Sequence, residues 1–203
     1  MTQTRQPGRA RQGFTLSETM LAMLILAFVG MIATTGLMTG LNTYYDIVEK
    51  SNAELLLSTT ISELRDELDR TEEISLTGTA LTAYRSSTSG WRVLRSVSLI
   101  AEGDPMDKKG IWVREYKGYP SADALSAAHA PQLLVTEATA TKGLYARFSS
   151  ITYDETKGEF TISGLQVRRI SDEKVLAEVS SGDEKEYKIR SLEKPTLHKQ
   201  SGS

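Results

Sequence analysis

The sequence predicts an α+β protein in which one long N-terminal helix is followed by an antiparallel β-sheet head. Three observations lead to this fold class. No charged side chain occurs from Thr19 to Tyr45, apolar residues recur at helical spacing after that run, and apolar and polar residues alternate from Trp91 onward. Apolar residues three or four apart mark one face of a helix, whereas strict alternation marks a strand with one buried face.

Residues 1–13 form a short basic leader that contains Arg5, Arg9 and Arg11 and no acidic residue. The whole chain of 203 residues has a net charge of −2, so the part after the leader is more acidic than that. Affinity for nucleic acid depends on Lys and Arg contacts to phosphates. An acidic chain is a poor match for that partner, and no nucleic-acid binding is expected.

Residues 14–45 are predicted to form a transmembrane helix. Apolar residues are densest from Met20 to Met38, and at 1.5 Å per residue this stretch has the length of a bilayer's hydrocarbon core, about 30 Å. The arginines precede the apolar run, so the positive-inside rule places the N-terminus in the cytoplasm and the residues after Tyr45 outside. The chain is therefore expected to be a single-pass membrane protein in contact with lipid.

Residues 46–73 are predicted to be an amphipathic continuation of the same helix. Their apolar positions at helical spacing are Leu57, Ile61, Leu64 and Leu68. One helix from about Thr15 to about Arg70 would be about 80 Å long. A membrane anchor alone does not need the amphipathic half, so this half is expected to pack against the domain that follows.

The alternative is a pair of helices broken near Asn42. Gly36 and Gly40 lie just before that point, and each glycine weakens a helix by about 1 kcal/mol relative to alanine. The sequence leaves both arrangements open.

Residues 74–194 are predicted to form the β-rich head. Single strands are expected in "WRVLRSVSLI" from Trp91, in "GIWVREYK" from Gly110 and in "LYARFSSITY" from Leu144. The segment "ITYDETKGEFTI" predicts a hairpin in which Gly158 takes the left-handed position of a bulged turn.

The remaining predictions for the head concern its later segments. A final pair of strands, "KVLAEV" and "EYKIRSL", is expected on either side of "SSGDEK", and "SADALSAAHA" after Pro120 is expected to form one or two helical turns. Residues 195–203 are expected to be a disordered tail.

Glu18 is a carboxylate at the entrance of the apolar run, and an acid at the centre of a membrane helix costs about 2.5 to 3.5 kcal/mol. One explanation is local, since "TLSE" fits a capping box in which Thr15 caps the helix and Glu18 reaches back to its amide. The other is assembly. Within a helical bundle that holds little water, a carboxylate and an amine attract strongly and either one alone is penalised, so the pair would fix the register between subunits.

The order of these features resembles the class III signal of type IV prepilins and pseudopilins. The signal consists of the basic leader ending in Gly13, the residues "FTLSE" and the long apolar run, and the resemblance extends to about Tyr45. It implies that a prepilin peptidase cuts between Gly13 and Phe14 on the cytoplasmic side and methylates the amino group of Phe14. Glu18 would then be the fifth residue of the mature chain, attracted to the amino terminus of a neighbouring subunit during filament assembly.

The resemblance also implies partners and a location. The partners are other pilin subunits, a membrane assembly platform and its ATPase, and the product is a surface filament or the pseudopilus of a secretion or competence system. Many major pilins carry a proline in the membrane half of the helix and a C-terminal cysteine pair. This chain has no cysteine and no proline in that half, which favours a minor pilin or a pseudopilin.

No enzyme activity, catalytic residue, cofactor or metal site is expected from the sequence. It contains no phosphate-binding glycine loop, no calcium loop and no recognisable nucleophile and base, and its two histidines, His129 and His198, lie in polar surroundings. The alternative function is an uncleaved signal-anchor protein with an extracytoplasmic β-rich domain that binds or senses a ligand. In that case the capping box only imitates the prepilin motif.

Overall fold

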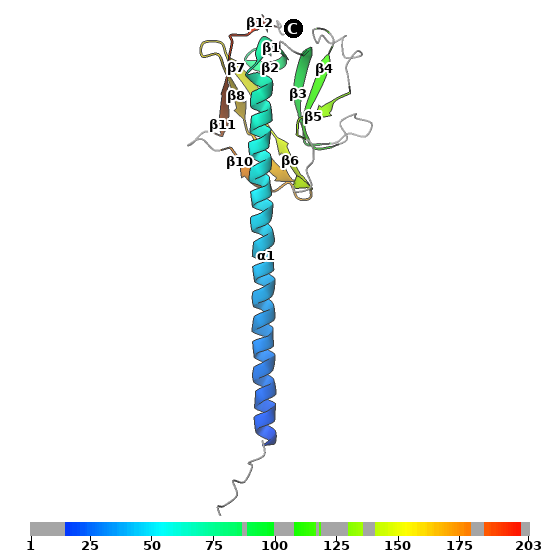
Figure 1. Ribbon diagram of the computed structural model, residues 1–203, viewed down its shortest axis with the longest axis vertical. Helices are drawn as coiled ribbons and strands as arrows, with labels where there is room; N and C mark the ends of the chain where they lie inside the picture. Colours follow the sequence, from blue (N-terminus) through cyan, green and yellow to red (C-terminus); the bar gives the residue numbers. More distant parts are fainter. Residues whose placement is uncertain are drawn as a thin grey trace, which may run out of the picture. The chain divides into compact units, whose positions relative to one another are not determined.

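The computed structural model describes residues 15–86, 89–99, 108–116, 118, 130–135, 141–179 and 185–199. The chain divides into two compact units, Met1–Ile47 and Val48–Ser203. Helix α1 (Leu16–Leu68) begins in the first unit and ends in the second. The strands gather around the part of α1 that belongs to the second unit (Figure 1), so the protein has the predicted α+β fold class.

Helix α1 is continuous over 53 residues, which confirms the prediction of a single helix and excludes a break near Asn42. Threonines inside its apolar half bond to the backbone of the preceding turn. The hydroxyl of Thr34 donates to the Gly30 carbonyl at 2.8 Å, and Thr35, Thr39 and Thr43 bond in the same way. Each hydroxyl is thereby satisfied within the helix. Residues 71–73, which were expected in the helix, instead begin the first strand.

The head contains twelve strands among the described residues. They are β1 (Thr71–Thr77), β2 (Ala80–Ser86), β3 (Trp91–Val97), β4 (Gly110–Tyr116), β5 (Gln132–Leu133), β6 (Leu144–Arg147), β7 (Ser150–Asp154), β8 (Glu159–Ser163), β9 (Gln166–Arg169), β10 (Val175–Glu178), β11 (Glu186–Arg190) and β12 (Thr196–Lys199). The strands predicted from Trp91 and Gly110 are confirmed as β3 and β4. The predicted helical turns of "SADALSAAHA" and the side chain of His129 lie outside the described residues.

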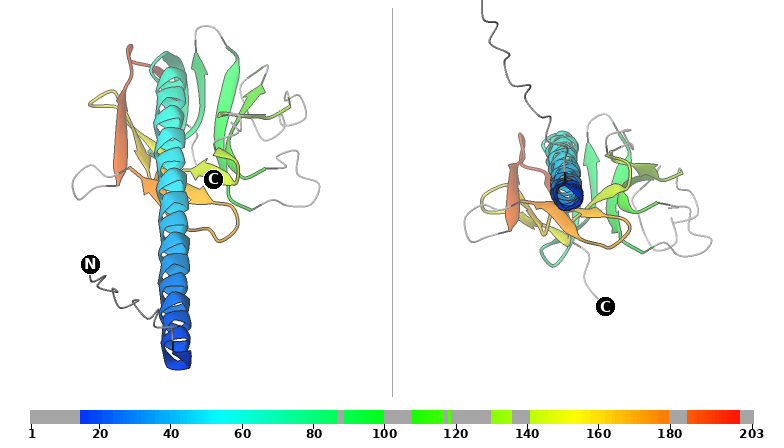
Figure 2. Two further views of the ribbon diagram at one scale, coloured as in Figure 1. Left: turned by 60° about the horizontal axis from the view of Figure 1, so that its bottom comes forward. Right: turned by 90° about the horizontal axis from the view of Figure 1, so that it is seen from below.

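Two sheets make up the head. Nine strands form the larger sheet in the order β11-β8-β7-β2-β3-β4-β5, and β1 joins it between β2 and β12. The smaller sheet has the order β10-β9-β6. In the end-on view of Figure 2 the strands lie on one side of α1 and along its flanks, with β11 on one flank and β3 and β4 on the other.

The hairpin formed by β7 and β8 confirms the prediction for "DETKG". The two strands pair in antiparallel register from Ser150 with Ser163 to Asp154 with Glu159. Gly158 has a φ of 68°, in the left-handed region where a side chain would be strained. The Asp154 carboxylate accepts the amide protons of Thr156 and Lys157 at 2.9 and 3.2 Å, which fixes the turn.

The single strand predicted from Leu144 to Tyr153 is wrong, because the chain changes sheets within it. β6 belongs to the smaller sheet and β7 to the larger one. Between them, the Ser149 amide donates to the Ser163 carbonyl at 2.8 Å. Gly164, with a φ of 66°, lies so close to Ser149 that a β-carbon there would collide with it. The chain therefore passes between the two sheets twice at the same place, once between β6 and β7 and once between β8 and β9.

Both strands of the predicted final pair are present, as β10 and β11, but they do not pair with each other. "KVLAEV" contains β10, which pairs with β9 in the smaller sheet, whereas "EYKIRSL" contains β11, which pairs with β8 in the larger sheet. The reason is the change of sheets at Gly164. The chain enters the smaller sheet there as β9, and β10 follows β9 and pairs with it.

The expected disordered tail is wrong for Thr196–Lys199, which form β12. This strand pairs in parallel with β1, from Glu73 with Thr196 to Leu76 with Lys199. The His198 side chain lies 3.1 Å from the Glu73 carboxylate and packs edge-on against Trp91. Pairing between residues so far apart in the chain leaves no local signal in the sequence.

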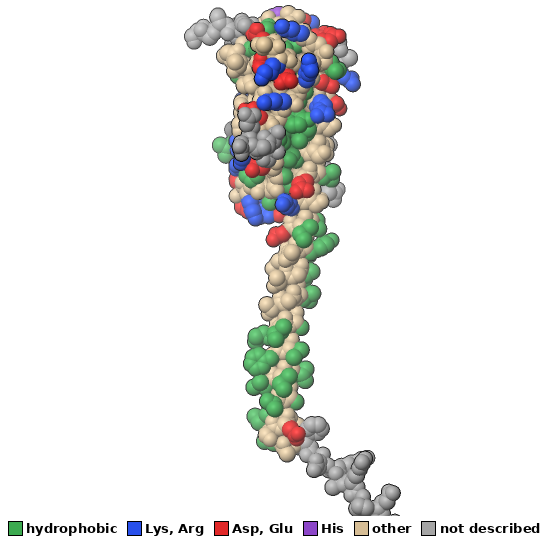
Figure 3. Space-filling view, turned by 90° about the vertical axis from the view of Figure 1, so that its left-hand side faces the viewer, with side chains coloured by type: hydrophobic (Ala, Val, Ile, Leu, Met, Phe, Trp, Pro, Cys, Tyr) green, Lys and Arg blue, Asp and Glu red, His purple; other side chains and the backbone are tan. Residues whose placement is uncertain are grey.

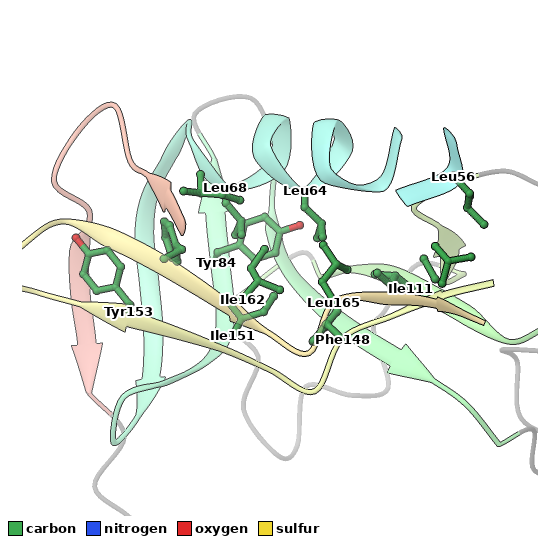
Figure 4. Close-up of a cluster of buried hydrophobic side chains, with 14 of the residues drawn as sticks. Leu56, Leu64, Leu68, Tyr84, Ile111, Phe148, Ile151, Tyr153, Ile162 and Leu165 are labelled. Atoms are coloured by element: carbon green, nitrogen blue, oxygen red, sulfur yellow. The ribbon is translucent and has the colours of Figure 1, made fainter. Parts of the chain in front are cut away.

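The core lies where α1 crosses the sheets. The buried stripe of α1 consists of Ala53, Leu56, Thr60, Leu64 and Leu68. Leu64 and Leu68, predicted to face the head, are completely buried and point toward Tyr84, Ile162 and Leu165 (Figure 4). Leu57 and Ile61 are only partly buried and pack at the edge of the same cluster. The amphipathic half of α1 is therefore part of the head's own core.

Candidate functional site

The start of α1 is a complete capping box. The Thr15 amide donates to Glu18 Oε2 at 3.1 Å, and the Glu18 amide donates back to Thr15 Oγ1 at 3.4 Å. The Thr15 hydroxyl also donates to Glu18 Oε2, at 3.2 Å. These bonds satisfy two of the amide groups that a helix leaves open at its first turn. The local explanation for Glu18 is thus confirmed.

The capping box uses only one of the two carboxylate oxygens of Glu18. All its bonds end on Oε2, and Oε1 has no hydrogen-bond partner among the described residues. A carboxylate can accept about four hydrogen bonds. Capping therefore leaves an exposed, negatively charged oxygen at the first turn that can accept an ammonium group from another chain.

The surface of α1 beyond Glu18 is uncharged and mostly apolar as far as Tyr45. Large apolar side chains from Leu16 to Ile47 are 43% to 81% exposed. Figure 3 shows hydrophobic side chains along this half of α1, whereas most of the Lys, Arg, Asp and Glu side chains in view lie on the head. Among the described residues α1 is long and apolar enough to cross a membrane. So much exposed apolar surface requires lipid or other helices around it.

Two of the predicted site residues, Gly13 and Phe14, lie outside the described residues. The structure therefore places one of the three, Glu18, at the exposed end of α1.

Two ion pairs between described residues join α1 to the head, and neither has a local signal in the sequence. Near the end of α1, Arg92 of β3 donates to both carboxylate oxygens of Glu67 at 2.9 and 3.0 Å, and Tyr84 of β2 donates to Glu67 at 2.8 Å. Burial, together with the Glu67 carboxylate, raises the pKa of Tyr84 well above its ordinary value. The Tyr84 hydroxyl therefore remains a hydrogen-bond donor at every ordinary pH.

The second contact joins Glu49, at the beginning of the second unit, to Arg169 of β9. Arg169 Nε lies 2.6 Å from Glu49 Oε1, and a further guanidinium nitrogen bonds to Oε2. This two-pronged geometry is the stronger form of an Arg–carboxylate pair. Glu49 and Arg169 are 120 residues apart, and only the fold brings them together.

Within the part of the chain that the structure describes, no group of three or more His, Asp or Glu side chains could hold a metal ion. His198, one of the two histidines, lies beside Glu73 as described above.

Comparison with known proteins adds one match. Residues 8–34 match the family model described as the prokaryotic N-terminal methylation motif. No curated protein and no solved structure matches the chain. The match spans the leader's end, Glu18 and the first part of the apolar run, so it supports a type IV prepilin-like signal. Together with the apolar half of α1, it makes the chain a membrane-anchored protein.

Proposed function

We propose that this chain, which has a type IV prepilin-like signal and is a type IV pilin-like protein, is a minor pilin or pseudopilin subunit. Prepilin peptidase cuts between Gly13 and Phe14 and methylates the new amino terminus. The mature subunit then joins other pilins through α1. One observation carries the proposal: the matched motif runs without a break into a helix whose first half is exposed and apolar and whose second half lies in the core of the head.

Glu18 is the proposed assembly residue. After cleavage, Thr15 is the second residue of the mature chain and the capping box is retained. The exposed Oε1 then accepts the ammonium group of a neighbouring subunit's first residue. The attraction between these charges grows as water is excluded from the helical bundle, so the pair guides an incoming subunit into register.

The proposed orientation has the leader in the cytoplasm and the head outside, because Arg5, Arg9 and Arg11 precede the apolar run. An assembly platform in the membrane and its ATPase would lift the subunit into a surface filament or pseudopilus. The motif belongs to structural proteins, and we assign the chain no catalytic role.

The mass of the mature protein tests the proposal. Purified from cells that contain prepilin peptidase, the chain should begin at Phe14 and carry one methyl group, as measured by intact-mass spectrometry. Gly13→Leu should leave the precursor uncut, because the peptidase must hold the backbone closely at this residue. A wild-type protein that retains Met1 or Thr2 would support the signal-anchor alternative and overturn the proposal, as would normal maturation of Gly13→Leu.

A further inference from the structure

A cavity of about 750 Å³ lies within the head, between α1 and strands β4, β5 and β6. Its volume is in the range of small-molecule sites, about 300 to 1,000 Å³. The cavity is separate from Glu18 and from the matched motif, and the proposed assembly role does not use it. Its lining residues come from Val48–Ser203 and are all described, so it belongs to one compact unit.

The wall of the cavity is mainly apolar. Leu56 of α1 and Ile111 of β4 lie near each other at one end of the core (Figure 4). The other apolar residues of the wall are Trp112, Leu133, Val135, Leu144, Ala146 and Ile170. Apolar surface in contact with water is unfavourable, so a ligand that covers this wall gains free energy by displacing water from it.

The polar side chains of the lining are already bonded within the protein. They belong to Thr60, Lys108, Lys109, Thr141 and Tyr145. The Thr60 hydroxyl donates to the Leu56 carbonyl at 2.7 Å, and Lys109 and Tyr145 both bond to the Glu173 carboxylate. Lys108 and Thr141 also have partners. The described lining therefore offers no free polar side chain to a charged group, and it suits an uncharged hydrocarbon.

The mouth of the cavity lies a short length of chain from the end of the uncharged run. Most of the lining residues are buried, whereas Ile170 is 38% exposed and Lys108 is also exposed, so these two mark the mouth. Ile170 follows Arg169, whose guanidinium pairs with Glu49. Glu49 is four residues after Tyr45, where the uncharged run ends, and four residues reach no more than about 14 Å. The hydrocarbon of the bilayer is therefore the nearest source of an apolar ligand.

We propose that the cavity takes the hydrocarbon chain of a membrane lipid and leaves the lipid's head group outside the mouth. The apolar wall matches such a chain, and the bonded polar side chains give a head group nothing to pair with. The same chemistry is present in single-chain acyl esters and in the phospholipids of the bilayer. The proposal goes beyond the filament role and does not depend on it.

Trp112 reports on the cavity because it is part of the lining and is only 6% exposed. Bromine atoms on an acyl chain quench tryptophan fluorescence on contact, so a chain inside the cavity should quench this indole. Trp91→Phe leaves Trp112 as the sole tryptophan, because the chain has only two. The full chain is reconstituted in phosphatidylcholine vesicles and titrated with the uncharged methyl ester of 9,10-dibromostearate. The quenching should saturate.

Two further arms examine the source of the chain and the part played by charge. In one, the vesicles consist of phosphatidylcholine with brominated acyl chains and contain no ester. Quenching in this arm identifies a phospholipid chain, whereas quenching by the ester alone identifies a single-chain ligand, and either result supports the proposal. In the other arm, free 9,10-dibromostearate should bind no more tightly than the ester, because no described lining side chain is free to pair with its carboxylate.

Variants separate the cavity from the bilayer background. Val135→Phe and Ile170→Phe fill the apolar wall and should raise the half-saturating concentration of the ester by about tenfold or more. Val175→Phe, the matched control, introduces the same side chain on β10 outside the lining. It should leave the half-saturating concentration unchanged.

Three results would overturn the proposal. They are quenching that does not saturate, quenching that is equal in the cavity-filling variants and Val175→Phe, and tighter binding of the acid than of the ester. Ile170 and Val175 are both 38% exposed, so their variants should be tolerated alike. Their comparison keeps the test decisive even where Val135→Phe fails to fold.

Discussion

At the scale of single residues, the two carboxylate oxygens of Glu18 have different surroundings, and the proposed assembly role uses the one that capping leaves free. The capping box occupies Oε2, and Oε1 is exposed. Capping and assembly were competing explanations of this carboxylate, but the geometry makes them compatible. A glutamine at this position can keep the cap, because Gln also serves at the third position of a capping box. It cannot keep the charge.

We expect Glu18→Gln to be cut normally and held in the membrane but to enter filaments poorly. The loss follows from an ammonium left unpaired inside a helical bundle, which by analogy with broken buried ion pairs costs about 3 to 5 kcal/mol. Quantitative blotting of sheared filaments against the membrane fraction measures the incorporated share. Glu54→Gln, an equal charge change at an exposed position of α1, is the matched control. Equal incorporation of Glu18→Gln and wild type would leave Glu18 as a cap only.

Tyr145 gives the head a dependence on alkaline pH. Burial, with the bonded Glu173 carboxylate, raises its pKa to about 12 from an ordinary value of 10.0. A raised pKa means that the contribution to stability is complete below about pH 10 and is lost as the pH rises toward 12, because the unfolded chain ionises first. The unfolding free energy should therefore fall less steeply between pH 10 and 12 in Tyr145→Phe than in wild type.

Chemical unfolding in detergent micelles, followed by tryptophan fluorescence, measures that slope. Below about pH 9 the two proteins should show the same slope, which serves as an internal control. Parallel curves over the whole range would show that Tyr145 ionises equally easily in both states.

At the scale of elements, α1 has two halves with different surroundings. Leu64 is completely buried against the sheets, whereas Leu55, on the same helix, is 58% exposed. We expect Leu64→Ala to lower the free energy of unfolding by about 2 to 5 kcal/mol, since it removes buried methyl groups and leaves a cavity. Leu55→Ala, the same chemical change on the exposed side, should cost no more than about 0.5 kcal/mol. Similar losses in the two variants, measured by urea unfolding, would mean that α1 is not packed on the sheets in this register.

The elements that the sequence predicted correctly are those with a local signal. The helical spacing of Leu64 and Leu68 predicted the face that is buried, "TLSE" predicted the cap, and Gly158 predicted the turn between β7 and β8. The errors occur where a contact with a distant residue determines which strand pairs with which. Ser149 and Gly164 approach each other where the chain passes between sheets, and β12 pairs with β1, which was not predicted as a strand.

The residues of the candidate site also divide into those with a local signal in the sequence and those without one. A short linear signal encodes Gly13, Phe14 and Glu18, so sequence alone could name them. The contacts that fix the head on α1, such as Glu49 with Arg169, join residues whose types are common on any surface. Only the completed fold distinguishes them from solvated charges.

At the scale of the whole molecule, the division between Ile47 and Val48 separates a part that needs lipid or neighbours from a part that has its own core. We expect a fragment that begins at Val48 to be soluble and folded, with a circular dichroism spectrum of mixed helix and strand. A fragment that begins at Thr71 lacks Leu56, Leu64 and Leu68, and should not fold. An unfolded or aggregated longer fragment, or a folded shorter one, would contradict the view that α1 is part of the head's core.

The pairing of β12 with β1 has a consequence for how the protein is made. β1 follows α1 directly, yet the edge that pairs with β12 stays bare until Thr196–Lys199 have left the ribosome, because the contact of Glu73 with His198 spans 125 residues. A translation product that stops before β12 therefore leaves one edge of β1 unpaired, and such edges invite aggregation. That bare edge is the feature that distinguishes an unfinished chain from a finished one.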